Sequence, residues 1–486
     1  MSLLSKLFGR SDDPAVLRRQ IEQARAQHDS ATVRRLLETL AKSGDAAAQR
    51  QLGEVCLAAA AYDNAREWLE KAAAQQDAEA EHQLGNLYLR GQGVAKNSAT
   101  AYAWQEKAAA QGCAAAQTAL GSHYAAGDGV AQDYGKARAW WEKAAAQQDA
   151  EAQYQLGLLY AGGLGVAQDY AAARTWCEQA AARGIAAAQT LLGRLYGGGL
   201  GVSQDHAKAR DWYTQAAERG DAEAQSVLAL YYYNGEGGEQ NLDKARQWFE
   251  KAAAQGDNDA LRNLGVLYAS GEGVVQDYKK AHDYWKQAAA RGDATAQNNL
   301  ARLYHDGLGV APDPAQAWQW WKTAAEQGNA DAQNHLAVCY LHGEGTTQDN
   351  KKACEWFEKA ALQGHAAAQY GLGILYGHSE ELDLPLTPAT ALLWLEKAAA
   401  AGHSGAQNAL GIRYARGIDV ARDYGKARTY WEQSAAGGDP EAQTNLGILY
   451  REGLGVTADL DAAKSWFEKA AAQGFAAAQE ALQALS

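Results

Sequence analysis

The 486-residue chain contains little of what secreted domains and redox enzymes depend on, with only 5 Cys, 6 Pro, 5 Phe and 1 Met. The number of cysteines is odd, and they stand at different positions within the chain's repeating pattern. Both facts favour reduced thiols over a disulfide framework. Cys339 and Cys354 would fall on two adjacent helices, so a bridge between them stays open as an alternative.

Basic residues are also fewer than acidic ones, with 45 Lys and Arg against 58 Asp and Glu. The formal net charge of −13 disfavours general nucleic-acid binding, because the chain has no basic field that could displace counterions from phosphates. The charge is uneven, since residues 1–44 carry eight Lys and Arg against five Asp and Glu. This basic head is either a solvated terminus or a contact for an acidic partner.

Long hydrophobic runs are missing. No segment has the length of a transmembrane helix, and the start MSLLSKLFGR lacks the apolar run of a signal peptide. We therefore expect a cytoplasmic protein without integral membrane association. Leu3, Leu4, Leu7 and Phe8 could form a short amphipathic patch, and whether this tail touches a membrane or a partner stays open.

A repeated leucine dominates what is present. It recurs every 36 residues, except for one step of 32 and one of 38. Two short helices with apolar residues at i, i+3 and i+4 lie in each period, joined by a glycine-rich loop such as residues 163–166. The leucines are Leu52, Leu84, Leu120, Leu156, Leu192, Leu228, Leu264, Leu300, Leu336, Leu372, Leu410 and Leu446.

This period predicts an all-α solenoid of about 27 helices. Its parts are a flexible basic tail at 1–12, a degenerate capping helical pair at 13–44, twelve repeats at 45–474 and a closing helix at 475–486. In the capping pair, Asp13 and Ser30 are the predicted N-caps of the two helices. A terminal pair with a polar outer face is what a solenoid requires.

The recurring residues have packing roles. A glycine directly after the leucine allows a close approach of the neighbouring helix. The landmark tryptophan of the second helix, for example Trp140 or Trp176, is predicted to be the large side chain that packs opposite this glycine. Asp133 and Asn241 represent the Asp or Asn that is predicted to cap each second helix.

These landmarks resemble the Sel-one-like repeat (SLR) family, which is related to the tetratricopeptide repeat. The family pattern, A-x-A-Q-x-x-L-G-x-x-Y-x-x-G-x-G-V-x-x-D-x-x-K-A-x-x-W-x-x-K-A-A-x-x-G, is met nearly in full by residues 114–148. The resemblance covers residues 45–486. It implies a right-handed superhelix with first helices on the concave side, and usually an adaptor role in protein complexes.

Catalytic and cofactor-binding patterns are not found. The Gly-Leu-Gly-Val loops lack the Gly-Lys-Ser/Thr of a phosphate-binding loop, and no Ser-x-x-Lys occurs. His305, His335 and His342 come from neighbouring repeats and, with Asp306, could form a metal site, but exposed polar residues are the preferred interpretation. We expect no enzyme activity, no cofactor and no metal.

The residues that vary between repeats must then carry the function. At −5, −2, +2, +5 and +6 from the leucine, they form one stripe on the first helix, which we expect to face the groove. Long amides, arginine and aromatics there suit peptide recognition, although they could equally be ordinary solvated residues. The candidates are Tyr154, Arg194, Tyr233, Arg262, Asn298, Arg302, His305, Asp306, Asn334, His342 and Tyr370.

The leading hypothesis is a monomeric scaffold that binds a peptide or protein segment in a concave groove centred on the repeats from Leu228 to Leu372. A bacterial specificity factor, either a toxin-neutralising immunity protein or an exported host-interacting factor, is the alternative. The repeat of Leu372 replaces its glycine loop with the two-residue-longer segment 378–388. Such insertions are often contact sites, and drift explains this one equally well.

Overall fold

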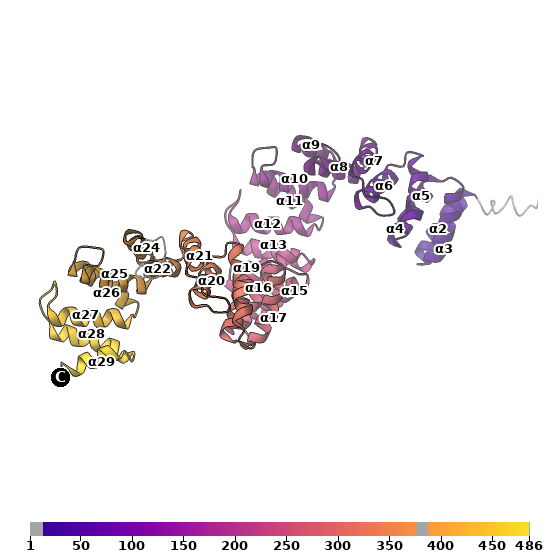
Figure 1. Ribbon diagram of the computed structural model, residues 1–486. Helices are drawn as coiled ribbons and strands as arrows, with labels where there is room; N and C mark the ends of the chain where they lie inside the picture. The colour runs from indigo at the N-terminus through magenta and orange to yellow at the C-terminus, as the bar shows by residue number, and fades with distance from the viewer. Residues whose placement is uncertain (1–12, 376–386, 486) are drawn as a thin grey trace, which may run out of the picture. The chain divides into compact units, whose positions relative to one another are not determined.

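A computed structural model describes residues 13–375 and 387–485 of the chain (Figure 1). Within these ranges it has 27 helices and no strand, which confirms the predicted all-α solenoid. The basic tail lies outside the described residues, as does all of the insertion except Thr387 and the first residue of the helix that follows it.

The helices follow one another in regular pairs. In chain order they are α2 (Pro14–Ala26), α3 (Ser30–Lys42), α4 (Ala46–Ala58), α5 (Tyr62–Ala73), α6 (Ala78–Arg90), α7 (Ser98–Ala110), α8 (Ala114–Ala126), α9 (Tyr134–Ala146), α10 (Ala150–Gly162), α11 (Tyr170–Ala182), α12 (Ala186–Gly198), α13 (His206–Glu218), α14 (Ala222–Asn234), α15 (Leu242–Ala254), α16 (Asn258–Ser270), α17 (Tyr278–Ala290), α18 (Ala294–Asp306), α19 (Pro314–Glu326), α20 (Ala330–His342), α21 (Asn350–Leu362), α22 (Ala366–Leu375), α24 (Pro388–Ala400), α25 (Ser404–Arg416), α26 (Tyr424–Ala436), α27 (Pro440–Glu452), α28 (Leu460–Ala472) and α29 (Ala476–Gln483).

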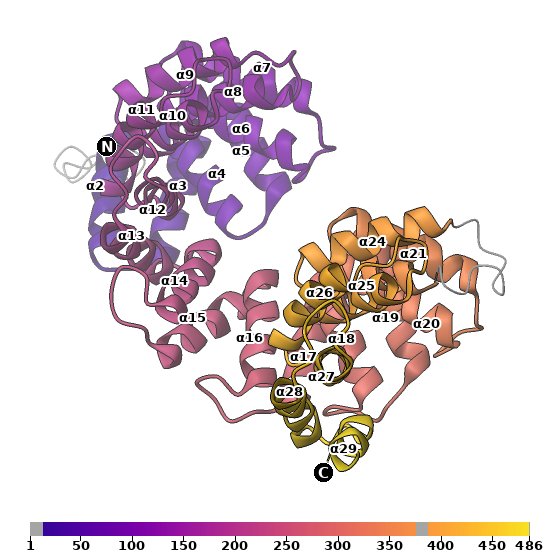
Figure 2. The ribbon, with the colours of Figure 1, turned by 90° about the vertical axis from the view of Figure 1, so that its left-hand side faces the viewer.

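The chain divides into two compact units, residues 1–251 and 252–486, with the boundary inside α15. Each helix packs mainly on its partner in the hairpin and on the next helix along the chain. First helices of adjacent repeats also contact one another, as α4 does with α6 in the first unit and α25 with α27 in the second. In Figure 2 the first helices of the first unit follow the inner side of its curve. We call the surface of the first helices the inner face.

Capping residues begin most helices. Asp133 accepts a hydrogen bond from the backbone N–H of Lys136, and Asn241 accepts one from Lys244, so both predicted caps are confirmed. In the terminal pair Asp13 caps α2 as predicted. The predicted cap Ser30 is wrong, because the side chain that accepts from Thr32 N–H belongs to Asp29 and Ser30 is the first helical residue.

The packing of the two helices in a repeat differs from the prediction by one residue. A Cβ atom built on Gly121 would lie 2.5 Å from the Trp141 indole, whereas the landmark Trp140 is only half-buried. The residue after the landmark tryptophan therefore packs against the glycine. The pairs are Gly53–Leu69, Gly85–Gln105, Gly121–Trp141, Gly157–Cys177, Gly193–Tyr213, Gly265–Trp285, Gly373–Leu395, Gly411–Trp431 and Gly447–Phe467.

The landmark tryptophan has a different partner. In many repeats the ammonium group of the lysine three residues later lies over its ring, at 3.8 Å for Lys143 over Trp140 and 3.7 Å for Lys359 over Trp356. Such cation–π contacts contribute about 0.5–1 kcal/mol at exposed sites. The tryptophan row thus covers the core from outside and helps to hold a lysine on the second helix.

The repeated glutamine of the first helix links three helices. Gln297 is 2 % exposed and donates to the carbonyl of Ala289 in α17, at 3.1 Å. It accepts from Gln327 at the end of α19, at 2.7 Å. The same two bonds recur for the pairs Gln49–Gln75, Gln117–Gln147, Gln333–Gln363 and Gln443–Gln473.

Replacing Gln297 with Ala should lower the free energy of unfolding by about 1–3 kcal/mol, because it removes one buried and one partly buried hydrogen bond and leaves the Ala289 carbonyl without its side-chain donor. Gln287→Ala, on the exposed side of α17, is the matched control and should change it by less than about 0.5 kcal/mol. Urea denaturation of the full chain measures both values. Equal effects of the two variants would contradict the linking role.

Candidate functional site

Two of the predicted site residues have partners within the fold, Arg262 in the next repeat and Asn298 in its own. Arg262 is half-buried and lies 2.8 Å from Asp293, the N-cap of the next first helix, and 2.5 Å from Asp259. Asn298 is 5 % exposed, and its side-chain oxygen accepts a hydrogen bond from the indole N–H of Trp321 at 3.1 Å. Both side chains are therefore engaged within the fold.

Other candidates are spread along the two units. Tyr154 is half-buried against the core of α11 and α12. Arg194 is exposed and lies 3.6 Å from Glu223, and Tyr370 stacks on His403 with ring centroids 4.6 Å apart. Of three further candidates, Tyr233 and Asn334 are half-buried and His342 is exposed.

Arg302, His305 and Asp306 are brought together in the second unit. They line a pocket of about 200 Å³ between α18 and α20, which we call the α18–α20 pocket. Its remaining lining residues are Trp321, His335, Val338, Cys339 and Glu344. None of these five was among the predicted site residues, although His335 was considered as a metal ligand.

His305 is held between two carboxylates. Its Nδ1 lies 2.7 Å from Asp306 and its Nε2 lies 3.4 Å from Glu344. The hydrogen bond to Asp306 chiefly raises the pKa of His305 against the opposing effect of burial, and Glu344 adds to the rise. The imidazole is thus favoured in its charged form, in which both ring nitrogens donate.

His335 has the opposite environment. Its ring stacks on Trp321 at 4.9 Å with an interplanar angle of 11°, and its buried Nδ1 has no hydrogen-bond partner among the described residues. Burial lowers the pKa of His335, and the nearby Arg302 lowers it further. The pocket therefore offers an unpaired ring nitrogen beside a charged histidine.

Arg302 lies where this pocket meets a second one. It and Asp306 also line a hollow of about 370 Å³ between α16 and α18, together with Val266, Asn299 and Leu308 among others. Arg302 is exposed and has no carboxylate partner within the described residues. A guanidinium without an internal partner is available to a carboxylate of another molecule.

The two histidines should titrate in opposite directions from the ordinary value of 6.5, His305 above it and His335 below it. The contribution of His305 to stability is fully present below its unfolded pKa and is lost as the pH rises through its raised folded pKa. The contribution of His335 to stability is present above its unfolded pKa and is lost as the pH falls through its lowered folded pKa. NMR titration of histidine-labelled protein, assigned with His305→Gln, checks this. The reverse order would contradict the described contacts.

Metal and thiol chemistry gain no support from the described residues. They contain no cluster of three or more His, Cys, Asp and Glu placed to hold a metal. Burial raises the pKa of Cys339 to about 12, so this thiol stays protonated and is a poor nucleophile. Cys339 and Cys354 are both free, so the alternative of a bridge between them is wrong.

The hairpins, their repeated glycine contacts and the glutamine links define a protein of the helical-repeat solenoid class. The chain belongs to the Sel1 repeat family, whose repeat model matches twelve consecutive segments. They are residues 46–77, 78–113, 114–149, 150–185, 186–221, 222–257, 258–293, 294–329, 330–365, 366–403, 404–439 and 440–475. Sel1 repeat proteins are generally protein-interaction scaffolds and generally not catalytic.

Solved structures agree with this assignment. The chain is similar to c5321, described as a protective antigen of uropathogenic Escherichia coli with an SLR fold, at 36% identity and a TM-score of 0.77. That match covers 86% of this chain and 90% of the other. A Sel1 repeat protein from Oxalobacter formigenes is 34% identical with a TM-score of 0.51, over 64% of this chain and 90% of its own. A search of curated protein sequences gives no match.

The part of the chain that the structure describes contains no helix with the length and apolar character needed to cross a membrane.

Proposed function

We propose that this protein is a non-enzymatic scaffold that binds a peptide or protein segment on the inner face of its repeats. The observation that carries the proposal is the surroundings of Arg302, an exposed guanidinium without an internal carboxylate partner, shared by two pockets of the second unit. Arginine at such a position can hold a carboxylate in two parallel hydrogen bonds.

The groups around Arg302 suit a mixed polar and apolar ligand. His305 adds a positive charge, although Asp306 and Glu344 already hold its two ring nitrogens. His335 supplies an unpaired ring nitrogen, and Val266 an apolar surface that is 40 % exposed. Anchoring residues of interfaces typically combine arginine and aromatic rings with such an apolar surround. We infer that an acidic side chain or a C-terminal carboxylate of the partner binds Arg302.

The double variant Arg302→Ala/His305→Ala tests this proposal. Both side chains are exposed on the inner face, so the melting temperature should stay within the range of ordinary surface changes. The variant should recover about tenfold less of the partner that the wild-type chain co-purifies, which corresponds to about 1.4 kcal/mol.

Lys286→Ala, on the exposed side of α17, removes a cation from the second-helix face and serves as the control. It should recover the partner as the wild type does. Equal recovery by the double variant, at equal melting temperature, would refute the proposed role of Arg302.

An exported, host-interacting factor is the second candidate function. The similarity that favours it is the one to c5321, whose description as a protective antigen applies to that protein. Fractionation of the native cell and its medium distinguishes the two candidates, because a scaffold of internal complexes stays with the cell.

A further inference from the structure

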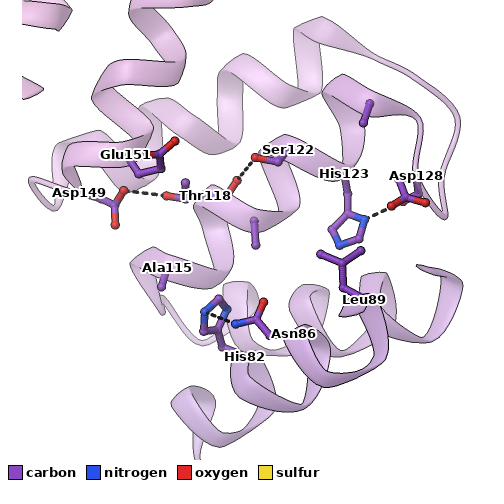
Figure 3. A pocket seen from close by; sticks show the side chains of 12 residues that line it. His82, Asn86, Leu89, Ala115, Thr118, Ser122, His123, Asp128, Asp149 and Glu151 are labelled. Atoms are coloured by element: carbon purple, nitrogen blue, oxygen red, sulfur yellow. Dashed lines mark hydrogen bonds between the residues drawn. The ribbon is translucent and has the colours of Figure 1, made fainter. Parts of the chain in front are cut away.

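The first unit has a groove of its own on the inner face, of about 470 Å³, formed by α6, α8 and the start of α10 (Figure 3). We call it the α8 groove. It shares no residue with the two pockets of the second unit. Its lining residues are His82, Asn86, Leu89, Ala115, Thr118, Ala119, Ser122, His123, Ala126, Asp128, Asp149 and Glu151.

His123 is the unusual residue of this groove. Its side chain is 3 % exposed, and its Nδ1 lies 2.6 Å from the backbone oxygen of Asp128. A carbonyl oxygen only accepts, so Nδ1 carries the proton and Nε2 presents a lone pair. This Nε2 is buried and has no partner within the described residues. In Figure 3 the ring projects from α8 into the groove beside Leu89.

The second histidine of the groove is fully engaged. Asn86 donates to His82 Nε2 at 3.1 Å, which places the proton on Nδ1, 2.7 Å from the side-chain oxygen of Gln105. Gln105 is fully buried and also donates to the His82 backbone oxygen at 3.2 Å. The orphaned acceptor of His123 is therefore not a general feature of histidines in this groove.

The charged groups of the α8 groove are all acidic. Asp128, Asp149 and Glu151 line it, and no Lys or Arg does. Within the described parts of the chain none of the three carboxylates has an ion-pair partner. Asp149 caps α10 by accepting from the Ala152 backbone N–H and also accepts from the Thr118 hydroxyl, and Glu151 accepts from Gln155. Figure 3 shows Asp149 and Glu151 beyond one end of the visible α8 segment and Asp128 beside His123 at the other.

We propose that the α8 groove binds a basic segment of a protein partner, with one cationic side chain at Glu151 and Asp149 and a second at Asp128 and His123 Nε2. An arginine or lysine N–H supplies the donor that the buried Nε2 lacks, and the half-buried Leu89 side chain moves aside to admit it. Unpaired carboxylates at both ends favour two positive charges on the ligand, since charge complementarity sets both specificity and the rate of association.

The α8 groove would bind a positively charged ligand, whereas the site around Arg302 would bind a carboxylate. The two sites have no residue in common. Binding at the α8 groove does not depend on Arg302, and the failure of one proposal leaves the other intact. A defined basic peptide can probe the α8 groove without the natural partner.

The test is a titration of the full chain with the capped pentapeptide acetyl-Ala-Arg-Ala-Arg-Ala-amide, in which both arginines point to one side of an extended backbone. The same peptide with glutamine in place of arginine is the neutral probe. We expect saturable binding of the arginine peptide that weakens with added salt, and a shift of the His123 Nε2 resonance in histidine-labelled protein. The glutamine peptide should bind at least tenfold more weakly.

Glu151→Gln and Asp128→Asn keep the shape of each side chain and should each weaken the arginine peptide about threefold to tenfold. Glu223→Gln, at the equivalent position of α14 outside the groove, is the matched control and should bind as the wild type does. His123→Asn should also lose affinity, and a fold check by circular dichroism accompanies it. Equal binding of the glutamine peptide, equal binding by Glu151→Gln and Asp128→Asn, or no saturable binding would each overturn the proposal.

Discussion

Replacing Phe467 with Ala should lower the free energy of unfolding of the last repeat by about 3–5 kcal/mol, because it empties a large site in a closed core. Phe467 is 0 % exposed and packs against Gly447, with Ala463, Ala470 and Ala478 around it. In a solenoid each repeat contacts only its neighbours, so the loss should stay local. Hydrogen exchange should show α27, α28 and α29 exchanging faster, with α4 to α9 unchanged.

Phe475→Ala is the matched control for this variant. Its side chain is only half-buried at the start of α29, so the same chemical change should cost less than half as much. Faster exchange throughout both units in Phe467→Ala would contradict the local coupling of repeats.

Replacing Gly265 with Val should destabilise the second unit by more than about 2 kcal/mol through overpacking. A Cβ atom at this position would lie 2.3 Å from the Trp285 indole nitrogen, which donates to the Arg262 backbone oxygen at 3.1 Å. The ring cannot retreat without losing that bond. Gly265→Ala should be milder, because alanine occupies the equivalent position 301, where the facing Trp321 bonds to a side chain instead.

Gly425→Val tests whether the effect is one of space or of helix propensity. Gly425 lies in the first turn of α26, and a Cβ atom there would meet only the Asp423 side chain, at 3.2 Å. The melting temperature of the Gly425→Val variant should stay close to that of the wild type. Similar losses at Gly265 and Gly425 would contradict the close-approach role of the repeated glycine.

Much of the fold could be predicted from the sequence, because each helix is specified by local signals. The 36-residue period, the caps such as Asp133 and the repeated glycine all depend on contacts within one hairpin. The packing partner of the glycine could not be predicted. Trp140 and Trp141 are both large and apolar, and only the rotation of the second helix decides which of them enters the core.

The candidate site was predicted less completely. Positions −2 and +2 from the leucine belong to one stripe in sequence, yet Asn298 is buried and bonded to Trp321 of its own hairpin, whereas Arg302 is exposed. The periodicity of the first helix does not show which of its polar side chains the second helix covers. The sequence contains one sign of the α8 groove. At the position after the landmark tryptophan, Gln105 is polar, whereas the other repeats have Leu, Trp, Cys, Tyr or Phe there.

The molecule therefore separates two tasks. Residues that recur, such as Gln297 and Gly265, stack the hairpins, while residues that vary on the inner face create sites of different chemistry. Around Arg302 the variable residues form the proposed site for a carboxylate, and the α8 groove presents carboxylates of its own. Both proposals assign partner binding to the first helices and leave the second helices to cover the core.

Site-specific photo-crosslinking in the native cell tests directly whether partners bind the first helices rather than the second. A benzophenone amino acid is placed at Val266, which is exposed on the inner face beside Arg302, or at Glu355, which is exposed on the second helix α21. We expect a discrete covalent complex with a partner protein from Val266 and none from Glu355. A complex formed from Glu355 alone would contradict it.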